Sequence, residues 1–517
     1  MPESETKSAD VSEIIEEISA KDAKNVDSYA KDFDIYAITE ENNGWYTKRL
    51  QIGSYKFPPY NSAFIQLLMT SFICFLCPGI HNALSGMGGG GRIDASTSNI
   101  AGIAFSCVSI LGFFYGGICN RLGVNQTMAL GGIGYSVYAA AFLCYNHTHN
   151  IGFVIFGGVL LGACCNFLWS AQGTVMMSYP IESHKGLYIS VFWIIFNLGA
   201  VIGSIIPLAN NIHVTTAKVV ADGTYAAFIA LMAVGALLGM CLLPAGKVIK
   251  SDGTRVIIQK NPSWRSEIQG FASVFHTDTY IIALFPLFLA SNFFYTYQFN
   301  DVNAARFSTR TRALNNLLYW FCQMFGSFII GYLLDWSYLT RRMRAKVGVI
   351  FLFVITMAIW GGGWAYAKSY TRAEVKSGKL TVMDWSDSGY IGPMFLFMFY
   401  GVYDAMYQTF CYWLIGSLTN NARKLAIFAG FYKGMQCVGG IIVFCMDWKL
   451  VEYHAIFGTS WALLAFGILL AVPIVFLKVK ESTAIEEDLK FSDETLEDVI
   501  GKRGLEAYIS NGEEEKV

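Results

Sequence analysis

The sequence predicts an all-α membrane protein with twelve transmembrane helices in two six-helix halves. The chain has 517 residues, of which 54% are hydrophobic and 15% charged, whereas soluble domains average about 25% charged. The two ends, 1–57 and 478–517, hold 19 and 18 charged residues, which leaves 38, about 9%, for the positions between them. So little charge cannot cover a water-facing surface, which excludes a soluble enzyme, a nucleic-acid binder and a disordered scaffold.

The second observation is a series of twelve apolar runs, each about 20 residues long, the length that crosses the hydrocarbon core as a helix. Strands of a β-barrel would be shorter and would alternate in polarity. The first six runs are 62–84, 97–119, 127–145, 151–178, 186–209 and 224–243. The last six are 279–298, 313–334, 347–367, 391–416, 424–446 and 455–477.

A polar segment, 244–278, divides the runs six and six. We therefore expect five parts: an acidic cytosolic tail, a six-helix bundle, a central cytosolic loop, a second bundle and a second acidic cytosolic tail. Their predicted bounds are 1–57, 58–243, 244–278, 279–477 and 478–517. The acidic runs within the tails are typical of solvated disorder.

Lys and Arg counts predict the orientation. With both termini in the cytosol, the inside segments hold 18 of these residues and the outside segments 10, in line with the positive-inside rule. Asn146 then begins a glycosylation sequon in an outside loop. The run Gly88–Gly91 follows the first span on the same side, and we expect it to form a flexible turn.

An internal repeat relates the two halves, with an offset of 214 residues early and 236 residues later. The matched residues are Gly112 and Gly117 with Gly326 and Gly331, and Gln172, Asn197 and Gly203 with Gln408, Lys433 and Gly439. A parallel repeat of six helices resembles the architecture of the major facilitator superfamily.

A second resemblance to that superfamily lies after spans 2 and 8. Its members carry a Gly-x-x-x-Asp-Arg-x-Gly-like turn at both places, and here the first copy is Gly116–Gly123, with Asn120 where Asp is usual. An acid that pairs with arginine across the seam in one state would act as a cytosolic gate. Ordinary positive-inside residues are the alternative. The candidate gate residues are Arg121, Asp335, Arg341 and Arg342.

Nearly all of the 38 core charges fall in loops or at span ends, and two do not. Asp404 lies near the middle of span 10 and Lys433 near the middle of span 11. A lone charge there costs on the order of 3 kcal/mol, so we expect the two to pair. One interpretation is a coupling site, in which Asp404 exchanges a proton and Lys433 is then free to bind an anionic group. The other is a permanent structural latch.

Polar residues on the spans that surround the central cavity of such a fold are candidates for lining it. Hydrogen bonds between helices are the alternative for about half of them. The candidates are Gln66, Asn166, Gln172, Asn197, Tyr295, Tyr403, Tyr407 and Gln408.

Five strings resemble the uncoordinated-93-like family, particularly its fungal members. They are Ser170–Thr174, Phe192–Asn197, Arg310–Asn316, Thr419–Lys424 and Phe431–Gly434. The likeness runs from about Asn61 to Phe476 and includes Asp404 and Lys433. It implies the fold of a major facilitator transporter. It also implies two possible roles, since fungal members are mostly described as transporters whereas animal relatives look like channel regulators or receptor-trafficking chaperones.

The predicted function is therefore transport of a small solute by alternating access, with coupling to protons through Asp404 as one of the two interpretations of the charged pair. The alternative is a non-transporting membrane regulator or trafficking chaperone of an ion channel or receptor. We expect no enzymatic activity, catalytic residue, metal, cofactor or nucleic-acid partner. The expected partners are the lipid bilayer, an unknown small solute and, for the alternative function, another membrane protein. The plasma membrane, the vacuole and the endoplasmic reticulum are all open as locations.

Overall fold

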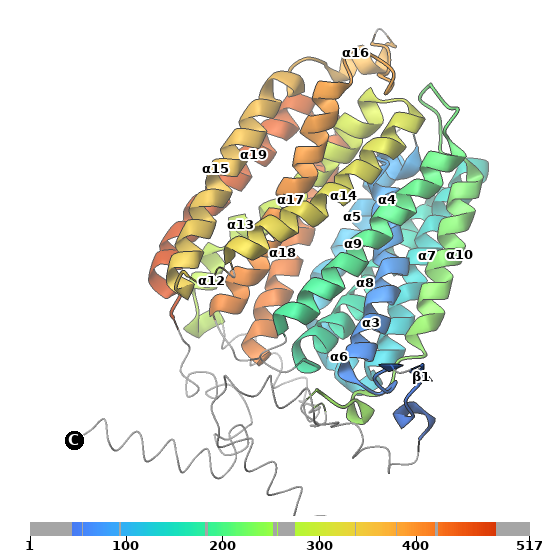
Figure 1. Cartoon of the computed structure of the whole chain (residues 1–517). Coiled ribbons are helices and arrows are strands. Elements are labelled where there is room, and N and C mark those ends of the chain that lie inside the picture. Colours follow the sequence, from blue (N-terminus) through green and yellow to red (C-terminus); the bar gives the residue numbers. More distant parts are fainter. Residues whose placement is uncertain are drawn as a thin grey trace, which may run out of the picture.

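A computed structural model describes residues 44–53, 55–92, 95–180, 185–251, 256, 275–334, 336, 338–378, 380–418 and 422–481. Most of both predicted tails and of the central loop, and Asp335 of the predicted gate, lie outside these residues. The described part is a bundle of long helices (Figure 1). We call the end that holds β1 the terminal end, and the end that holds α16 the loop end.

The N-terminal half begins at the terminal end with a short turn and a two-stranded hairpin in which Gln51 faces Lys56. Each of the first six predicted spans coincides with a helical stretch. The elements are η2 (Trp45–Thr47), β1 (Gln51–Ile52), β2 (Tyr55–Lys56), α3 (Ala63–Cys74), η3 (Phe75–Gly79), α4 (Ile80–Gly86), η4 (Gly89–Gly91), α5 (Ser96–Ser109), η5 (Ile110–Phe114), α6 (Tyr115–Leu122), α7 (Val124–Thr148), α8 (Ile151–Ser178), α9 (Lys185–Asn210), α10 (Asp222–Gly239) and η7 (Ala245–Lys247).

The C-terminal half repeats this arrangement, and each of the last six predicted spans again coincides with a helical stretch. The seventh continues as a helix to Ala304, beyond its predicted end at residue 298. The elements are α12 (Tyr280–Ala283), α13 (Phe285–Thr296), η8 (Tyr297–Ala304), α14 (Thr309–Leu334), α15 (Arg341–Ala367), α16 (Arg372–Lys376), α17 (Ile391–Leu418), α18 (Ala422–Trp448) and α19 (Tyr453–Lys478).

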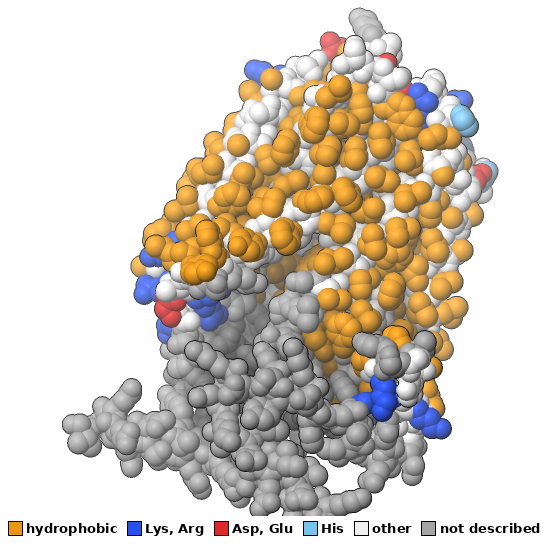
Figure 2. All heavy atoms as spheres, in the orientation of Figure 1, with side chains coloured by type: hydrophobic (Ala, Val, Ile, Leu, Met, Phe, Trp, Pro, Cys, Tyr) orange, Lys and Arg blue, Asp and Glu red, His pale blue; other side chains and the backbone are white. Residues whose placement is uncertain are grey.

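The surface of the bundle is that of a membrane protein. Hydrophobic side chains cover the face shown in Figure 2, and the charged side chains in view gather at the two ends. Ten stretches within the described residues have the length and hydropathy of a membrane span. The apolar part of the second span is shorter, Ser96–Gly112, and α17 is made more polar by Asp404, Gln408 and its tyrosines. The chain is thus an integral, multi-pass membrane protein.

The repeat predicted from the sequence appears in the helix packing. The Gly203 Cα faces Ala83 and Ile80 of the first span, and its counterpart Gly439 faces the backbone of Leu289 in the seventh. Likewise, Gly112 faces Asn166 on α8, and Gly326 faces Val402 on α17. Equivalent glycines therefore allow equivalent helices to approach closely in both halves.

The first span of each half is interrupted at a corresponding place. The segment η3 is a π-helix that contains Pro78, which cannot donate a backbone hydrogen bond, and η8 is an eight-residue π-helix. Such insertions leave backbone groups outside the regular helical ladder and are frequent at functional sites. Interrupted helices at matching positions of two repeats are typical of transporter binding regions.

The glycine run at the loop end differs from its prediction. Gly88–Gly91 does form a turn, but its residues are buried and all four have positive φ angles, from 56° to 83°. A Cβ on Gly88 would lie 1.9 Å from the carbonyl oxygen of Phe299, in the other half. The expectation of a flexible turn is wrong, because glycine here permits a tight contact between the halves rather than mobility.

Two glycines on α14 give a matched test of this packing. A Cβ on Gly326 would lie 2.2 Å from the carbonyl oxygen of Val402, whereas nothing lies within 4 Å of one on Gly331. We expect Gly326→Ala to destabilise the purified protein by about 1–3 kcal/mol, since backbone must move, and Gly331→Ala to leave it unchanged. Thermal unfolding in detergent measures both, and equal effects would contradict the assigned contact.

Candidate functional site

Asp404 lies in the middle of α17 and has no exposed surface. The Tyr295 hydroxyl, from α13, donates to its two carboxylate oxygens, with distances of 3.0 and 2.8 Å. From α14, the Tyr319 hydroxyl lies 3.0 Å from Oδ2, and the Gln323 amide donates to the same oxygen. All of these donors are uncharged. The carboxylate is therefore held by hydrogen bonds in the protein interior, and no cation of the described residues forms an ion pair with it.

Lys433 lies on α18 where the halves meet. Its Nζ donates to Gln436 Oε1 at 3.0 Å. The Gln436 amide in turn donates to Gln408 Oε1 at 2.9 Å, and Gln408 is one helical turn after Asp404 on α17. Rings from both halves surround the ammonium group, with centroids 5.4 Å away for Trp169 on α8, 5.4 Å for Tyr412 and 5.5 Å for Tyr432.

The direct ion pair that the sequence suggested is absent from this conformation. None of the ion pairs among the described residues joins Asp404 to Lys433. The physical reason is that uncharged donors satisfy the carboxylate and aromatic faces stabilise the ammonium. The two charges still interact electrostatically, and Gln408 and Gln436 lie between them. The site is a charge pair separated by amides, not a latch in direct contact.

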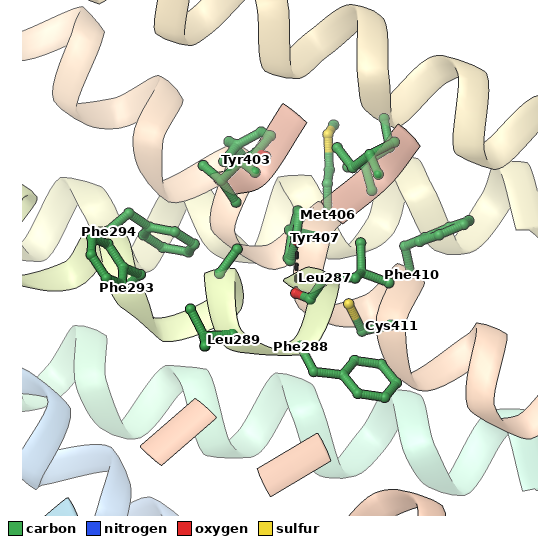
Figure 3. Close-up of a cluster of buried hydrophobic side chains, with 14 of the residues drawn as sticks. Leu287, Phe288, Leu289, Phe293, Phe294, Tyr403, Met406, Tyr407, Phe410 and Cys411 are labelled. Carbon is green, nitrogen blue, oxygen red and sulfur yellow. Dashed lines mark hydrogen bonds between the residues drawn. The ribbon is translucent and has the colours of Figure 1, made fainter. Parts of the chain in front are cut away.

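Of the predicted cavity residues, Tyr295 and Gln408 belong to this site, and the structure assigns several others to helix packing. Gln66 joins the backbone of Tyr60 and Leu243, and Asn166 donates to the Val108 carbonyl. The Tyr403 hydroxyl contacts Thr356 at 2.9 Å, and the Tyr407 hydroxyl donates to the Leu287 carbonyl at 2.8 Å. Figure 3 shows Tyr403 and Tyr407 within a cluster of buried hydrophobic side chains. These four positions therefore hold helices together in this conformation.

The other two cavity candidates differ in exposure. Gln172 is half-buried on α8. Asn197, on α9, is 2% exposed, and its buried Oδ1 has no hydrogen-bond partner among the residues that the structure describes. An orphaned acceptor of this kind is costly in a protein interior. Asn197 is the repeat counterpart of Lys433, so the two halves place polar side chains at corresponding positions.

Tyr319, Gln323 and Trp169 are site residues that the sequence analysis missed. The cavity candidates lie on spans 1, 4, 5, 7 and 10, whereas Tyr319 and Gln323 lie on span 8. Their spacing of four residues on an apolar helix places both on one face, and that signal could have identified them. Trp169 has no comparable signal, because an aromatic residue in a membrane helix is ordinarily a packing residue.

Arg312 closes the loop end of the seam between the halves. It lies on α14 with no exposed surface. Its guanidinium donates to three carbonyl oxygens of the N-terminal half, those of Met87 at 2.9 Å, Gly88 at 2.8 Å and Arg92 at 2.9 Å. Since an arginine cannot be left in the interior without acceptors, this contact ties the glycine turn to the opposite half.

A cluster of buried polar and charged side chains also joins the two halves at the loop end. Asp447 accepts hydrogen bonds from Asn99 of the N-terminal half at 2.8 Å and from Asn300 at 3.1 Å. Arg372 pairs with Asp447 at 2.6 Å and with Asp301 at 3.1 Å. We call Arg312 and this cluster together the loop-end lock.

Three charged residues of the loop-end lock lie in the protein interior, contrary to the prediction from the sequence. The sequence analysis assigned Asp301, Arg312 and Asp447 to loops or span ends, yet they are 1%, 0% and 2% exposed. Asp301 lies in the helical extension η8, which the apolar pattern does not reveal because its residues are polar. Interior charges are therefore not confined to Asp404 and Lys433.

The described gate candidates lie near the terminal end. Arg341 donates to the Gly416 carbonyl at the end of α17, at 3.2 Å. The Arg342 backbone amide lies 3.4 Å from a Glu481 carboxylate oxygen, and Arg121 is exposed near the end of α6. Asn146 is at the loop end, within the last turn of α7, where its side-chain oxygen accepts a hydrogen bond from Arg92.

The segment 368–390 is held over the loop end by Asp384. Arg310 donates to its two carboxylate oxygens at 2.9 and 2.5 Å, and Ser308 and Ser386 donate at 2.6 and 2.8 Å. The hydrogen bonds from Arg310, with those from Ser308 and Ser386, hold the pKa of Asp384 well below its usual range.

This shift predicts how the segment responds to acid. A carboxyl with a lowered pKa in the folded protein contributes stability above the unfolded value, about 3.9, and loses it as the pH falls below that value towards the folded one. We expect the protection of residues 380–390 from hydrogen exchange, relative to the intrinsic rate at each pH, to be equal at neutral and mildly acidic pH. Asp384→Asn should reduce this protection at both. Lower protection of the wild type at mildly acidic pH would contradict the assigned shift.

The described residues contain no group of three or more His, Cys, Asp or Glu side chains suited to a metal ion.

Comparison with known proteins identifies the family. The sequence profile of the Major Facilitator Superfamily matches residues 60–444. A UNC93-like protein of Schizosaccharomyces pombe is 48% identical over 447 residues, which cover 86% of this chain and 88% of that relative. The chain belongs to the UNC93-like family of the major facilitator superfamily. UNC93-like protein 1 of Arabidopsis thaliana is 42% identical over 424 residues, 81% of this chain and 92% of the relative.

Solved structures share the fold of this UNC93-like chain at low sequence identity. The xylose transporter from E. coli, in a partially occluded inward-open conformation, aligns with a TM-score of 0.55 and 15% identity, covering 82% of this chain and 99% of the transporter. A D-xylose-proton symporter gives a TM-score of 0.52 with 12% identity, covering 81% and 99%. The resemblance to the uncoordinated-93-like family and the twelve-helix fold expected from the sequence are confirmed.

Proposed function

We propose that this UNC93-like protein is a secondary transporter that moves a small solute by alternating access and uses Asp404 to couple that movement to protons. The observation that carries the proposal is the environment of Asp404. A carboxylate removed from water costs free energy, and binding a proton removes that cost. A permanent structural acid would be expected to contact a cation, whereas the contacts of Asp404 are with Tyr295, Tyr319 and Gln323.

Asp404 can bind a proton while its hydrogen-bond partners remain satisfied. The Tyr319 hydroxyl lies 3.0 Å from Asp404 Oδ2 and 2.8 Å from Gln298 Oε1, but it has one hydrogen to donate. When Asp404 is ionised, Tyr319 donates to it. When Asp404 is protonated, the carboxyl donates to the Tyr319 oxygen and Tyr319 donates to Gln298. Both protonation states thereby remain satisfied.

Alternating access requires contacts that close each end in turn. The loop-end lock joins the halves through hydrogen bonds, which supports a conformation closed at that end. At the terminal end, the candidate gate of Arg121, Asp335, Arg341 and Arg342 would close the opposite state. With both termini in the cytosol, as the Lys and Arg distribution favours, the loop end faces away from the cytosol and Asn146 lies on that side, with its amide nitrogen buried in this conformation.

Solute profiling tests this function. Full-length protein is reconstituted into liposomes, a pH gradient is imposed across them, and accumulation from a labelled metabolite extract is compared with protein-free liposomes. We expect at least one solute to accumulate only when protein and gradient are both present. If none accumulates, and loss of the chain in cells instead mislocalises another membrane protein, the role of a regulator or trafficking chaperone replaces transport.

A further inference from the structure

We infer that the transported solute is a small organic monoanion with a flat apolar body, bound at Lys433 between the two halves and moved together with one proton. The inference rests on the proposed function and adds the class of substrate and the charge moved in each cycle. It is carried by the surroundings of Lys433 and by the balance of charge between Lys433 and Asp404.

The ammonium of Lys433 has bonding capacity left over. It carries three N–H donors, and among the described residues its hydrogen bond is to Gln436, at 3.0 Å. The rest of its surroundings are aromatic faces, which stabilise the charge but accept no conventional hydrogen bond. No carboxylate of the described residues forms an ion pair with it. An incoming anion can therefore bind Lys433 without displacing a protein acid.

The position of Lys433 suits a ligand that both halves must contact. Trp169 belongs to α8 of the N-terminal half, whereas Tyr412 and Tyr432 belong to α17 and α18 of the other half. Trp193, on α9, extends this aromatic lining, since its ring centroid lies 6.0 Å from that of Tyr412. A ligand held here touches the surfaces that separate when the halves rock.

The aromatic lining favours an anion whose body is flat and apolar. Phosphate and chloride hold water strongly, and flat rings offer no hydrogen bonds to replace that water. An organic anion with an apolar, flat body recovers free energy by burying its apolar surface and by stacking against the Trp and Tyr rings. Its single charged group then pairs with the Lys433 ammonium.

Charge balance sets the coupling. In the empty carrier, ionised Asp404 and Lys433 sum to zero. With one anion at Lys433 and one proton on Asp404, the sum is again zero. A carrier loaded with the anion alone carries one net negative charge, and one loaded with the proton alone carries one net positive charge. Because a net charge in the membrane interior is costly, the empty and doubly loaded carriers are the forms that reorient.

The other side chains around Asp404 and Lys433 do not change the net charge of the site. Around Asp404 they are Tyr295, Tyr319 and Gln323, with Tyr403 on its own helix. Around Lys433 the titratable side chains are the thiols of Cys165, Cys411 and Cys437 and the hydroxyls of Tyr412 and Tyr432. Phenol and thiol groups are uncharged below their ordinary pKa values of about 10 and 8.5, so these side chains do not enter the charge sum.

Three probes that share a benzene ring and differ in charge test the site: benzenesulfonate, benzamide and phenyltrimethylammonium. Thermal unfolding of the purified full chain is measured with each. We expect benzenesulfonate to raise the unfolding temperature of the wild type in a saturable manner and the other two to have no such effect. Lys433→Gln should abolish the shift, and Lys433→Arg should retain part of it. Lys449→Gln is the matched control, because Lys449 also lies over a tryptophan ring but is exposed.

Two results would overturn the substrate class: an equal benzenesulfonate shift in wild type and Lys433→Gln, or stabilisation by benzamide or the cation in place of the anion. Absence of any benzenesulfonate shift would overturn it as well. These results are separable from failure of transport. A Lys433-dependent shift without pH-driven uptake contradicts the proposed function alone, whereas pH-driven uptake of a neutral or cationic solute contradicts this inference alone.

Discussion

Replacing Asp404 with Asn is expected to reduce solute accumulation driven by a pH gradient by more than about tenfold, a loss of about 1.4 kcal/mol of coupling free energy or more. Exchange of labelled for unlabelled solute across the membrane should continue. Asparagine resembles the protonated acid, so the variant can reorient with solute bound, but it can no longer release a proton on the opposite side.

The stability of this variant separates the coupling role from the latch. Because the described contacts of Asp404 are with uncharged groups, Asp404→Asn should unfold at the same temperature as the wild type or higher. A latch predicts the opposite, with partial recovery in the double variant with Lys433→Gln. Asp222→Asn, at an exposed position of the loop end, is the control for both assays. Unchanged pH-driven accumulation in Asp404→Asn would contradict the coupling role.

Replacing Arg312 with Met is expected to open the loop end. The substitution removes three hydrogen bonds to carbonyl oxygens of the other half. The Gly88 carbonyl keeps its hydrogen bond from the Gly91 amide at 3.0 Å, whereas the Met87 and Arg92 carbonyls lose the donor that Arg312 supplied. Bonds to charged groups contribute roughly 1.5–3 kcal/mol each and are not additive. We therefore expect the closed conformation to lose about 3 kcal/mol, which shifts the equilibrium between closed and open forms about 100-fold.

Hydrogen exchange followed by mass spectrometry measures this change. In Arg312→Met, amides of residues 85–92 and 299–312 should exchange faster than in the wild type, while those of α19 should not. Lys376→Met removes an exposed charge at the same end and should change neither region. If exchange in Arg312→Met is faster throughout the chain, the arginine stabilises the whole fold and is not specific to the lock.

The fold was largely predictable because a membrane helix has a strong sequence signal. Twenty apolar residues in a row have few alternatives to spanning the bilayer as a helix, so all twelve runs coincide with helical stretches. The exceptions are polar. The π-helix over Tyr297–Ala304 continues beyond the predicted span end at residue 298 and carries Asn300, Asp301 and Asn303 there. These polar residues resemble a loop in the sequence, and their burial depends on partners from other helices that no local pattern shows.

The candidate site was predictable in its charges but not in its contacts. Asp404 and Lys433 were evident, since a charge within an apolar run is conspicuous. Which donors reach Asp404 depends on how α13 and α14 face α17, and the neutral pair Tyr319 and Gln323 was overlooked in favour of the nearest opposite charge. Arg312 was misplaced for a different reason. Its position at a helix start looked exposed, and only the fold of Gly88–Gly91 around it makes it buried.

Protonation of Asp404, together with an anion bound at Lys433, changes which end of the molecule is open. Double electron–electron resonance between two spin labels measures the opening at each end directly. The labels are attached to unnatural amino acids, because the 12 cysteines of the chain would compete for a thiol-reactive label. One pair, Thr148 and Ile391, reports on the loop end, and another, Met240 and Leu477, on the terminal end, all at exposed positions. We predict that lowering the pH in the presence of benzenesulfonate changes the two distances in opposite directions in the wild type and changes neither in Asp404→Asn. Distances that do not depend on pH in the wild type, or that respond equally in Asp404→Asn, would show that Asp404 does not control which end is open.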